Sequence, residues 1–275
     1  MTGSGYSAPA IAGSGTVACG LAACASAVSE TLLLARSDES ASRAEEQAQA
    51  LCGKLDAGDA GRVTVTTAIA EVAGCDLVVE AIVEDPEEKG ALLAALAEAA
   101  PGADLATTTS SLGVEALGLR SGSPERVFGL HPFNPVTRME LVEICVPDGT
   151  RDGILERARA WCKAIGKTVV EVPDQPGFVV NRLLFPYLFD AVRLKERTGM
   201  KPEDVDRCMT LGAAHPMGPL ALLDMVGLDV SAAIGEALHS DSGEEQHRPP
   251  GALVELVGEG KLGRKSGAGF YDYDG

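Results

Sequence analysis

The sequence contains no apolar run long enough to cross a bilayer. Hydrophobic side chains make up 45% of its 275 residues. However, glycine, proline or a charged residue interrupts every apolar stretch well short of the ~20 residues that a membrane span requires. Residues 1–10 also lack the basic region and the apolar core of a secretory signal. These absences predict a globular protein that has no membrane partner and stays in the cytoplasm.

Paired cysteines are also missing. The chain has seven cysteines, an odd number, which are widely spread and include no C-x-x-C pair. This pattern argues against a disulfide framework and against a zinc site, and it favours a reducing compartment. We therefore expect no bound metal, and we interpret the cysteines as small buried hydrophobic side chains.

Basic residues are scarce relative to acidic ones. The chain has 23 lysines and arginines against 40 aspartates and glutamates, which gives a formal net charge of −17. Such a charge disfavours nucleic acid and anionic membrane surfaces as partners. An anionic ligand must therefore be held by local backbone amides and a few basic side chains.

The first two thirds of the chain alternate short β-type runs with helix-type runs. The predicted strands are 10–12, 31–34, 63–66, 77–81, 105–107, 127–130, 141–146 and 168–172, and the predicted helices are 16–27, 40–55, 86–99 and 151–165. Alternation of this kind predicts an α/β fold with a doubly wound, mostly parallel sheet of the Rossmann type.

A joint rich in proline and glycine, residues 173–177, ends this alternation. Helical runs follow it at 178–198, 202–211 and 220–238, and no further strand is convincing. The polar, proline-rich stretch 241–251 is typical of an exposed loop. We therefore expect two domains, a Rossmann domain over residues 1–175 and an all-helical domain over residues 176–275.

Residues 13–18, with the sequence GSGTVA, match the G-x-G-x-x-G/A pattern between a predicted strand and a predicted helix. Gly13 permits the tight turn, and Gly15 lets the backbone approach a pyrophosphate. The amides that begin the helix, at Thr16 and Val17, can then face the phosphates. This context predicts a dinucleotide site.

The end of the second predicted strand bears on the choice between NAD and NADP. Folds that select NAD carry an acidic residue there, which accepts from the ribose 2′-hydroxyl. Here the strand ends at Arg36 and Ser37. A guanidinium can bind a 2′-phosphate bidentately, and Ser37 can add a neutral donor to the same phosphate, so we favour NADP over NAD. The alternative is that Arg36 is solvated and that Asp38 reaches the ribose.

His131 ends a predicted strand, in the sequence His-Pro-Phe-Asn-Pro, and Glu143 follows twelve residues later inside an apolar strand. A buried carboxylate needs a partner, and an imidazole on the preceding strand is a suitable one. Such a pair forms a general base, in which Glu143 fixes the tautomer and His131 takes a hydroxyl proton. Spacing alone leaves open that they are a surface histidine and an edge-strand acid.

With these motifs, the chain resembles the 3-hydroxyacyl-CoA dehydrogenase family from about residue 8 to residue 275. The motifs that carry the resemblance are Thr-Ser-Ser-Leu at 109–112, His-Pro-Phe-Asn-Pro at 131–135, Leu-Val-Glu at 141–143, Pro-Gly-Phe-Val-Val-Asn-Arg at 176–182, His-Pro-Met-Gly-Pro at 215–219 and Leu-Gly-Arg-Lys-Ser-Gly at 262–267. The resemblance implies hydride transfer between a nicotinamide cofactor and the 3-hydroxy or 3-keto carbon of an acyl thioester.

The resemblance also assigns roles to particular side chains. It implies that His131 and Glu143 are the acid/base pair, that the Ser110 hydroxyl polarises the substrate oxygen, and that the Asn181 amide assists. Taken without the family, Ser110 is more simply a helix N-cap and Asn181 a first-turn helix residue. The helical domain is implied to close the substrate cleft and to pair into a homodimer.

Three further positions are implied to lie near the cofactor. Glu84 and Lys89 match family positions there, with Lys89 near a ribose. Thr108 stands next to the nicotinamide, where relatives usually carry asparagine.

The sequence departs from the family between the second and third predicted strands. Relatives carry a lysine-rich helical hairpin there, which reaches toward coenzyme A, whereas residues 51–59 contain one lysine among acids. The acyl group can therefore be carried by CoA or by the phosphopantetheine arm of an acyl carrier protein. Two alternative functions are a dehydrogenase of free hydroxy acids or sugar acids, and a nucleotide-binding protein without enzymatic activity.

Overall fold

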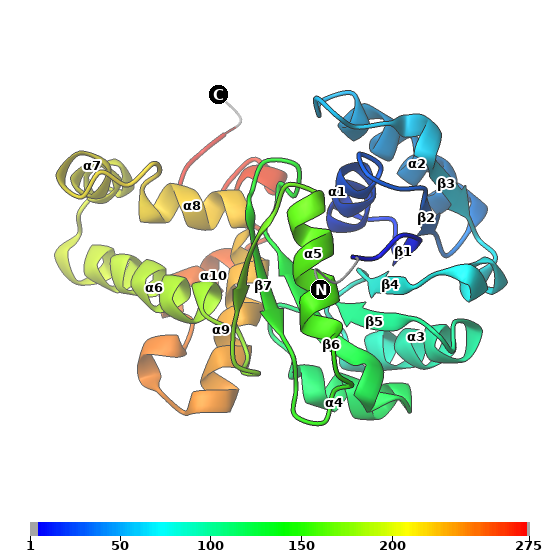
Figure 1. The fold of residues 1–275 in the computed structure, drawn as a ribbon. Coiled ribbons are helices and arrows are strands. Elements are labelled where there is room, and N and C mark those ends of the chain that lie inside the picture. Colours follow the sequence, from blue (N-terminus) through cyan, green and yellow to red (C-terminus); the bar gives the residue numbers. More distant parts are fainter. Residues whose placement is uncertain (1–4, 274–275) are drawn as a thin grey trace. The chain divides into compact units, whose positions relative to one another are not determined.

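The computed structural model describes residues 5–273, which form two compact units that divide between Gln175 and Pro176 (Figure 1). The first unit combines strands and helices, and the second is helical. Within residues 5–273, no helix is both long enough and apolar enough to cross a membrane.

The first unit is built on an eight-stranded sheet. Its strands are β1 (Pro9–Ala12), β2 (Thr31–Leu34), β3 (Val63–Thr66), β4 (Leu77–Glu80), β5 (Asp104–Thr107), β6 (Val127–Pro132), β7 (Leu141–Cys145) and β8 (Thr168–Glu171). Their order is β3-β2-β1-β4-β5-β6-β7-β8, and all neighbours are parallel except β6 and β7. The predicted doubly wound sheet is confirmed, and its order reverses between β1 and β4, where open α/β sheets bind their ligands.

Five α-helices accompany the sheet: α1 (Thr16–Ala25), α2 (Asp38–Cys52), α3 (Pro86–Ala99), α4 (Val114–Ser121) and α5 (Ile154–Ala164) (Figure 1). Four of them were predicted, and α4 was not. The first two amides of α4, at Val114 and Glu115, donate to the carboxylate of Asp174 over 2.8 Å each. Because this cap comes from 60 positions away, the local sequence carries no sign of where the helix begins.

Helix α1 packs tightly enough to fix the position of its N-terminus. Residues 18–25 are all buried, and most of their side chains are small. A Cβ atom on Gly20 would lie only 2.8 Å from the Cβ of Val136. The first turn of α1 is thereby held directly after the carboxyl end of β1.

All seven cysteines are free thiols. Five are buried, as predicted for small hydrophobic side chains, whereas Cys75 is half-buried and Cys208 is exposed. In the part of the chain that the structure describes, no three His, Cys, Asp or Glu side chains are grouped so that they could hold a metal ion.

The second unit contains α6 (Val180–Thr198), α7 (Pro202–Gly212), α8 (Pro219–Val226), α9 (Leu228–Ser242) and α10 (Gly251–Gly258). The all-helical prediction is confirmed, with two corrections. The predicted helix 220–238 is two helices, because Gly227 has φ +103° and interrupts the helical path. The stretch 241–251 is not simply an exposed loop, since His247 is buried and its Nδ1 lies 2.6 Å from the Ser242 hydroxyl.

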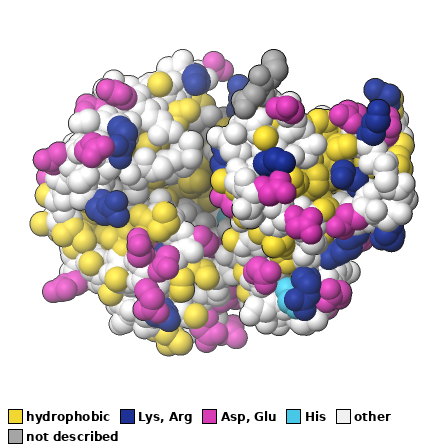
Figure 2. Space-filling model, turned by 180° about the vertical axis from the view of Figure 1, so that it is seen from behind, with side chains coloured by type: hydrophobic (Ala, Val, Ile, Leu, Met, Phe, Trp, Pro, Cys, Tyr) yellow, Lys and Arg dark blue, Asp and Glu magenta, His cyan; other side chains and the backbone are white. Residues whose placement is uncertain are grey.

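The surface is predominantly acidic, in line with the net charge of −17. Acidic side chains are scattered over the face seen in Figure 2, and basic side chains lie among them. An anionic ligand therefore depends on backbone amides and basic side chains close to its site. In the first unit such groups lie at the carboxyl ends of the strands.

Candidate active site

A cavity of about 880 Å³ opens in the first unit where β1, β2 and β4 end. Six of the predicted cofactor residues line it: Gly13, Gly15, Thr16, Val17, Arg36 and Thr108. The cavity therefore coincides with the switch point of the sheet, and its size is in the range of cofactor sites.

The glycines of the 13–18 motif have separate steric roles. A Cβ atom on Gly13 would lie 2.2 Å from the Ala81 carbonyl oxygen, so no larger residue fits between β1 and the segment after β4. A Cβ on Gly15 would meet no protein atom within 4 Å, because Gly15 borders the open cavity. No side chain caps the start of α1, which leaves the first amides of that helix directed at this space. This arrangement suits a pyrophosphate.

Two arginines line the same cavity. Arg36 follows β2 and is exposed, and Arg43 lies farther along α2, where its guanidinium is paired with Glu39 at 2.5 Å. Asp38, the alternative ribose ligand, is not among the lining residues, and its carboxylate accepts from the Thr67 hydroxyl at 3.4 Å. The side of the cavity next to β2 is therefore cationic.

Ser37, predicted to donate to a phosphate, instead caps α2. Its hydroxyl accepts from the amide of Ser40 at 3.3 Å, and its own amide donates to the Ser40 hydroxyl at 3.0 Å. Ser37 does not line the cavity. Its hydroxyl therefore contributes to forming α2, the helix that carries Arg43.

His131 and Glu143 face each other across the antiparallel strands β6 and β7, where they occupy paired register positions. The His131 Nδ1–H donates to Glu143 Oε2 over 2.8 Å, and both residues are buried. The Phe133 ring contacts the imidazole edge to face, with 4.7 Å between ring centroids. The carboxylate thus orients the imidazole and directs the proton-transfer role to the other ring nitrogen, Nε2.

Glu84 holds the segment that follows β5. Its Oε1 atom accepts from the Thr109 hydroxyl at 2.6 Å and from the amides of Ser110 and Ser111 at 2.8 Å each. Burial alone would raise the pKa of Glu84, but the nearby Lys89 ammonium and these hydrogen bonds lower it below its usual value. Glu84 is therefore a carboxylate anchor for this segment.

Lys89 lies elsewhere than the resemblance implied. Its side chain is completely buried and does not line the cavity. The ammonium donates to Glu80 Oε1 at 2.8 Å and lies 3.4 Å from Glu84 Oε2. The predicted contact with a ribose is thus replaced by an ion pair behind the cavity wall.

The two remaining predicted residues lie in different units. Ser110 is half-buried after β5, and its hydroxyl lies 3.4 Å from Glu84 Oε1. It is not a helix cap, because α4 begins after Gly113. Asn181 is buried in the first turn of α6, in the second unit.

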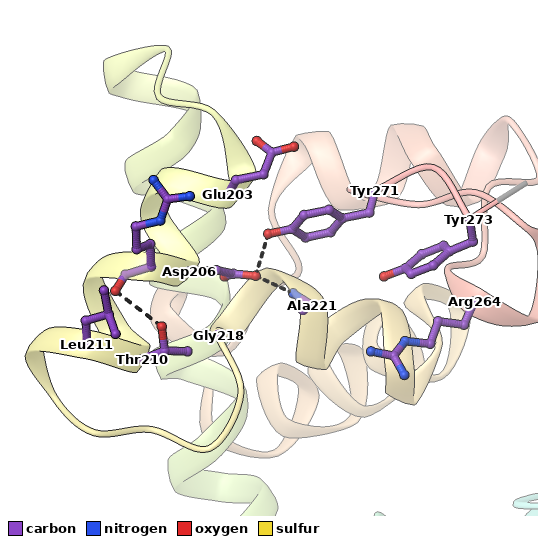
Figure 3. A pocket seen from close by; sticks show the side chains of 10 residues that line it. Glu203, Asp206, Thr210, Leu211, Gly218, Ala221, Arg264, Tyr271 and Tyr273 are labelled. Carbon is purple, nitrogen blue, oxygen red and sulfur yellow. Dashed lines mark hydrogen bonds between the residues drawn. The ribbon is translucent and has the colours of Figure 1, made fainter. Parts of the chain in front are cut away.

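The second unit has a cavity of its own, of about 520 Å³ (Figure 3). The Tyr271 hydroxyl points to Asp206 and donates to its carboxylate at 2.7 Å, and the same carboxylate accepts from the amides of Leu220 and Ala221. None of the predicted site residues lines this cavity. The Asp206 carboxylate at its centre already caps α8, so this cavity offers no chemistry comparable to that of the His131–Glu143 pair.

Sequence reasoning missed Arg43, Glu80 and Thr109. Arg43 lies near the start of the helix that follows Arg36, and this proximity could have suggested a second cation near the same site. Glu80 is a glutamate inside an apolar strand, which is the same signal that identified Glu143. Thr109 was noted only as part of a motif, and its partner in the fold comes from a different strand.

Comparisons with known proteins cover both units. Residues 9–175 match the family described as 3-hydroxyacyl-CoA dehydrogenase, NAD binding domain, and residues 177–273 match the family described as 3-hydroxyacyl-CoA dehydrogenase, C-terminal domain. The chain is 43% identical over 214 residues to a probable 3-hydroxybutyryl-CoA dehydrogenase of Deinococcus radiodurans, with 78% of this chain and 77% of that protein covered.

Two further relatives match over nearly the full chain. Human mitochondrial hydroxyacyl-coenzyme A dehydrogenase is 39% identical over 282 residues, which covers 96% of this chain and 90% of the human protein. The crystal structure of (S)-3-hydroxybutyryl-CoA dehydrogenase PaaH1 from Ralstonia eutropha superposes with a TM-score of 0.92 at 32% identity, and covers 98% of this chain and 100% of that one. The shared fold therefore includes both units.

Proposed function

Because this chain belongs to the 3-hydroxyacyl-CoA dehydrogenase family, we propose a residue-level account of how it interconverts the 3-hydroxy and 3-keto groups of an acyl thioester. The observation that carries the account is the buried His131–Glu143 pair in the same unit as the dinucleotide cavity. Gly13, Gly15 and the first amides of α1 would hold the dinucleotide, which would supply the acceptor for the hydride that leaves C3 of the substrate in the oxidation direction.

His131 takes the hydroxyl proton at Nε2 while C3 loses its hydride. Glu143 accepts from Nδ1–H throughout, so it fixes the tautomer and stabilises the imidazolium that forms. In the reduction direction, the same imidazolium returns the proton to the substrate oxygen. Because the pair is held on two hydrogen-bonded strands, the imidazole needs little reorganisation during the reaction.

Ser110 and Asn181 are proposed to bind the reacting oxygen. The Ser110 hydroxyl can donate to the substrate oxygen, on which negative charge develops during proton transfer. The Asn181 side chain supplies an amide that can hydrogen-bond to the substrate or to His131. Both roles rest on the family motifs in which these two residues stand.

The cofactor is proposed to be NADP rather than NAD. Arg36 and Arg43 both line the cavity, and a phosphate on the ribose would give them a charge-assisted partner. The Arg43–Glu39 pair is exposed on the surface of α2 and is therefore weak enough to yield to a phosphate. Asp38 is turned toward Thr67, which supports the same preference.

The acyl carrier is proposed to be recognised mainly through its phosphopantetheine arm. Helix α2 ends at Cys52, and only a short connection with a 3₁₀ turn at Ala60–Arg62 leads to β3. This connection leaves no room for the lysine-rich hairpin expected to contact the nucleotide end of CoA. The names of the relatives support a CoA thioester as one substrate.

The second unit is proposed to bind substrate and to pair into a homodimer, as the family resemblance implies. The proposed site of action is the cytoplasm, with no nucleic acid or membrane partner. A dehydrogenase of free hydroxy acids is not favoured, because the relatives are named for CoA thioesters.

The test is a matrix of initial rates that crosses NADH and NADPH with acetoacetyl-CoA and free acetoacetate. We expect turnover of the thioester with at least one cofactor, and little turnover of the free acid. Faster reduction of the free acid than of the thioester would instead support the hydroxy-acid alternative. Dinucleotide binding without turnover of any substrate would support a non-enzymatic role.

A further inference from the structure

A chain of three charged side chains, of which the first two are buried, connects the interior of the sheet to the segment that carries Ser110. Glu80, at the end of β4, and Lys89, in α3, are both completely buried and lie 2.8 Å apart. Glu80 Oε2 also accepts from the Thr107 hydroxyl at the end of β5, over 2.7 Å. Two neighbouring strands and one helix are thereby tied together at the carboxyl edge of the sheet.

Lys89 continues this chain to Glu84. Its ammonium lies 3.4 Å from Glu84 Oε2, while the other oxygen of Glu84 faces the segment after β5. Burying the Glu80 carboxylate and the Lys89 ammonium is costly unless each finds partners, and here both do, whereas the Glu84 side chain stays 33% exposed. Glu80 is held by Lys89, Thr107 and the Ile82 amide, and Glu84 by Lys89 and the 109–111 segment.

The segment after β5 depends on Glu84 for its conformation. Residues 108–113 form no helix or strand. Their polar groups converge on one atom, because the side chains of Thr109 and Ser111 and the amides of Ser110 and Ser111 all donate to Glu84 Oε1 within 2.9 Å. Thr109 also accepts from the amide of Leu112, which closes a tight turn around the carboxylate.

Neither Glu84 nor Lys89 borders the dinucleotide cavity, although their neighbours Val83 and Glu88 do. Contact with the cofactor therefore does not explain why these two charges are present. Their contacts all lead toward the 109–111 segment, and Ser110 is the member of that segment to which the proposed function gives a substrate contact.

We propose that Glu84 is a positioning residue, anchored by the buried Lys89–Glu80 pair, that clamps the 109–111 segment and thereby aims the Ser110 hydroxyl at the substrate oxygen. The catalytic part of this inference rests on the proposed function of Ser110, whereas the clamp itself does not. A displacement of ~1 Å in such a group can lower turnover by about 100-fold. Glu84 thus acts on the reaction through Ser110.

The test compares Glu84→Ala, Ser110→Ala and the double variant. Lys89 keeps Glu80 as its partner when Glu84 is removed, so the substitution leaves no unpaired buried charge. Glu84→Ala should lower kcat by ~10- to ~100-fold, with the Kd of the dinucleotide, measured by titration, changed by less than about threefold. In the Ser110→Ala background, the same substitution should lower kcat by no more than about twofold, because the group that it positions is already gone.

Amide hydrogen exchange in the absence of ligands tests the clamp independently of activity. The amides of Ser110 and Ser111 should exchange at least ~10 times faster in Glu84→Ala, while the amides of β5 keep their wild-type rates. Glu87→Ala is the matched control, because Glu87 lies three positions after Glu84, in the first turn of α3, is exposed and pairs only with Arg120 in the structure described. This control substitution should change neither kcat nor the exchange rates of the Ser110 and Ser111 amides.

Two results would overturn the proposal. Unchanged exchange at Ser110 and Ser111 would show that Glu84 is no clamp. An equal loss of kcat from Glu84→Ala with and without Ser110 would show that Glu84 acts by another route. If Ser110→Ala keeps full turnover while exchange accelerates in Glu84→Ala, the clamp stands, and the role that the proposed function gives to Ser110 is what fails.

Discussion

At the scale of single residues, the position of a side chain at a strand end decides what the first unit can bind. Arg36 follows β2 and lines the dinucleotide cavity, while the neighbouring Ser37 caps α2. Of these two adjacent residues, one thus lines the cavity and the other caps a helix. In a protein of net charge −17, we expect one exposed cation at this position to have a large effect on which cofactor binds.

Cofactor preference should therefore depend on Arg36. We expect kcat/KM for NADPH to exceed that for NADH by ~10- to ~100-fold, since a charge-assisted hydrogen bond contributes about 1.5–3 kcal/mol. Arg36→Asp should remove or reverse the preference, because a carboxylate accepts from a ribose hydroxyl and repels a phosphate. Arg159→Asp makes the same charge change at an exposed site on α5 and should leave the ratio unchanged. Equal use of both cofactors by the wild type would exclude Arg36 as the residue that reads the 2′ position.

The lowered pKa of Glu84 predicts how its contribution to stability depends on pH. A carboxylate with a depressed pKa in the folded state stabilises the protein above its unfolded pKa, near the usual value of 4.5, and this stabilisation is lost as the pH falls through the lowered value. The Tm difference between wild type and Glu84→Gln should thus be largest above pH 4.5 and shrink in more acidic buffer. A difference that stays constant across this range would contradict the account.

At the scale of secondary-structure elements, periodicity and turn residues predicted much of the fold. All eight strands follow from short apolar runs bounded by polar or glycine-rich stretches. The His131–Glu143 pair could also be predicted from the sequence, because twelve residues separate the two positions and a simple antiparallel pairing of strands brings them together. By contrast, α4 and the Glu80–Lys89–Glu84 chain depend on partners from distant segments, which no local pattern reveals.

Substitutions of the two glycines in the turn between β1 and α1 should separate effects on stability from effects on cofactor binding. Gly13→Ala places a Cβ atom against the Ala81 carbonyl oxygen, and overpacking of this kind costs about 1–3 kcal/mol. We expect its Tm to fall by at least ~2 °C. Gly15→Ala meets no protein atom, so it should keep the wild-type Tm and weaken dinucleotide binding at least ~10-fold. Both quantities follow from thermal melts and ligand titration, and unimpaired binding by Gly15→Ala would remove the pyrophosphate from this turn.

At the scale of the whole molecule, the chain combines a family fold with an unusual distribution of charge. Both units match the same family, so the chemistry implied by the resemblance is retained. The chain, however, carries 17 more acidic than basic groups, and the connection between α2 and β3 is short. From these two features together we expect weaker contacts with the nucleotide end of CoA.

Thioesters of a short pantetheine mimic should consequently react nearly as well as CoA thioesters. We expect the two kcat/KM values to agree within about tenfold when acetoacetyl-pantetheine and acetoacetyl-CoA are compared at the same cofactor concentration. A preference for CoA above ~100-fold corresponds to roughly 2.7 kcal/mol of recognition. Such a preference would mean that other residues have taken over the role of the missing hairpin.

The central claim is that the His131–Glu143 pair moves the proton in a hydride-transfer reaction on an acyl thioester. The measurement that tests it most directly is single-turnover reduction of acetoacetyl-CoA by His131→Ala, with dinucleotide Kd determined on the same preparation. The account predicts a rate at least ~100-fold below that of the wild type, with Kd nearly unchanged, as is typical for loss of a general acid/base group. A variant that binds the dinucleotide normally and turns over at a near-wild-type rate would contradict it.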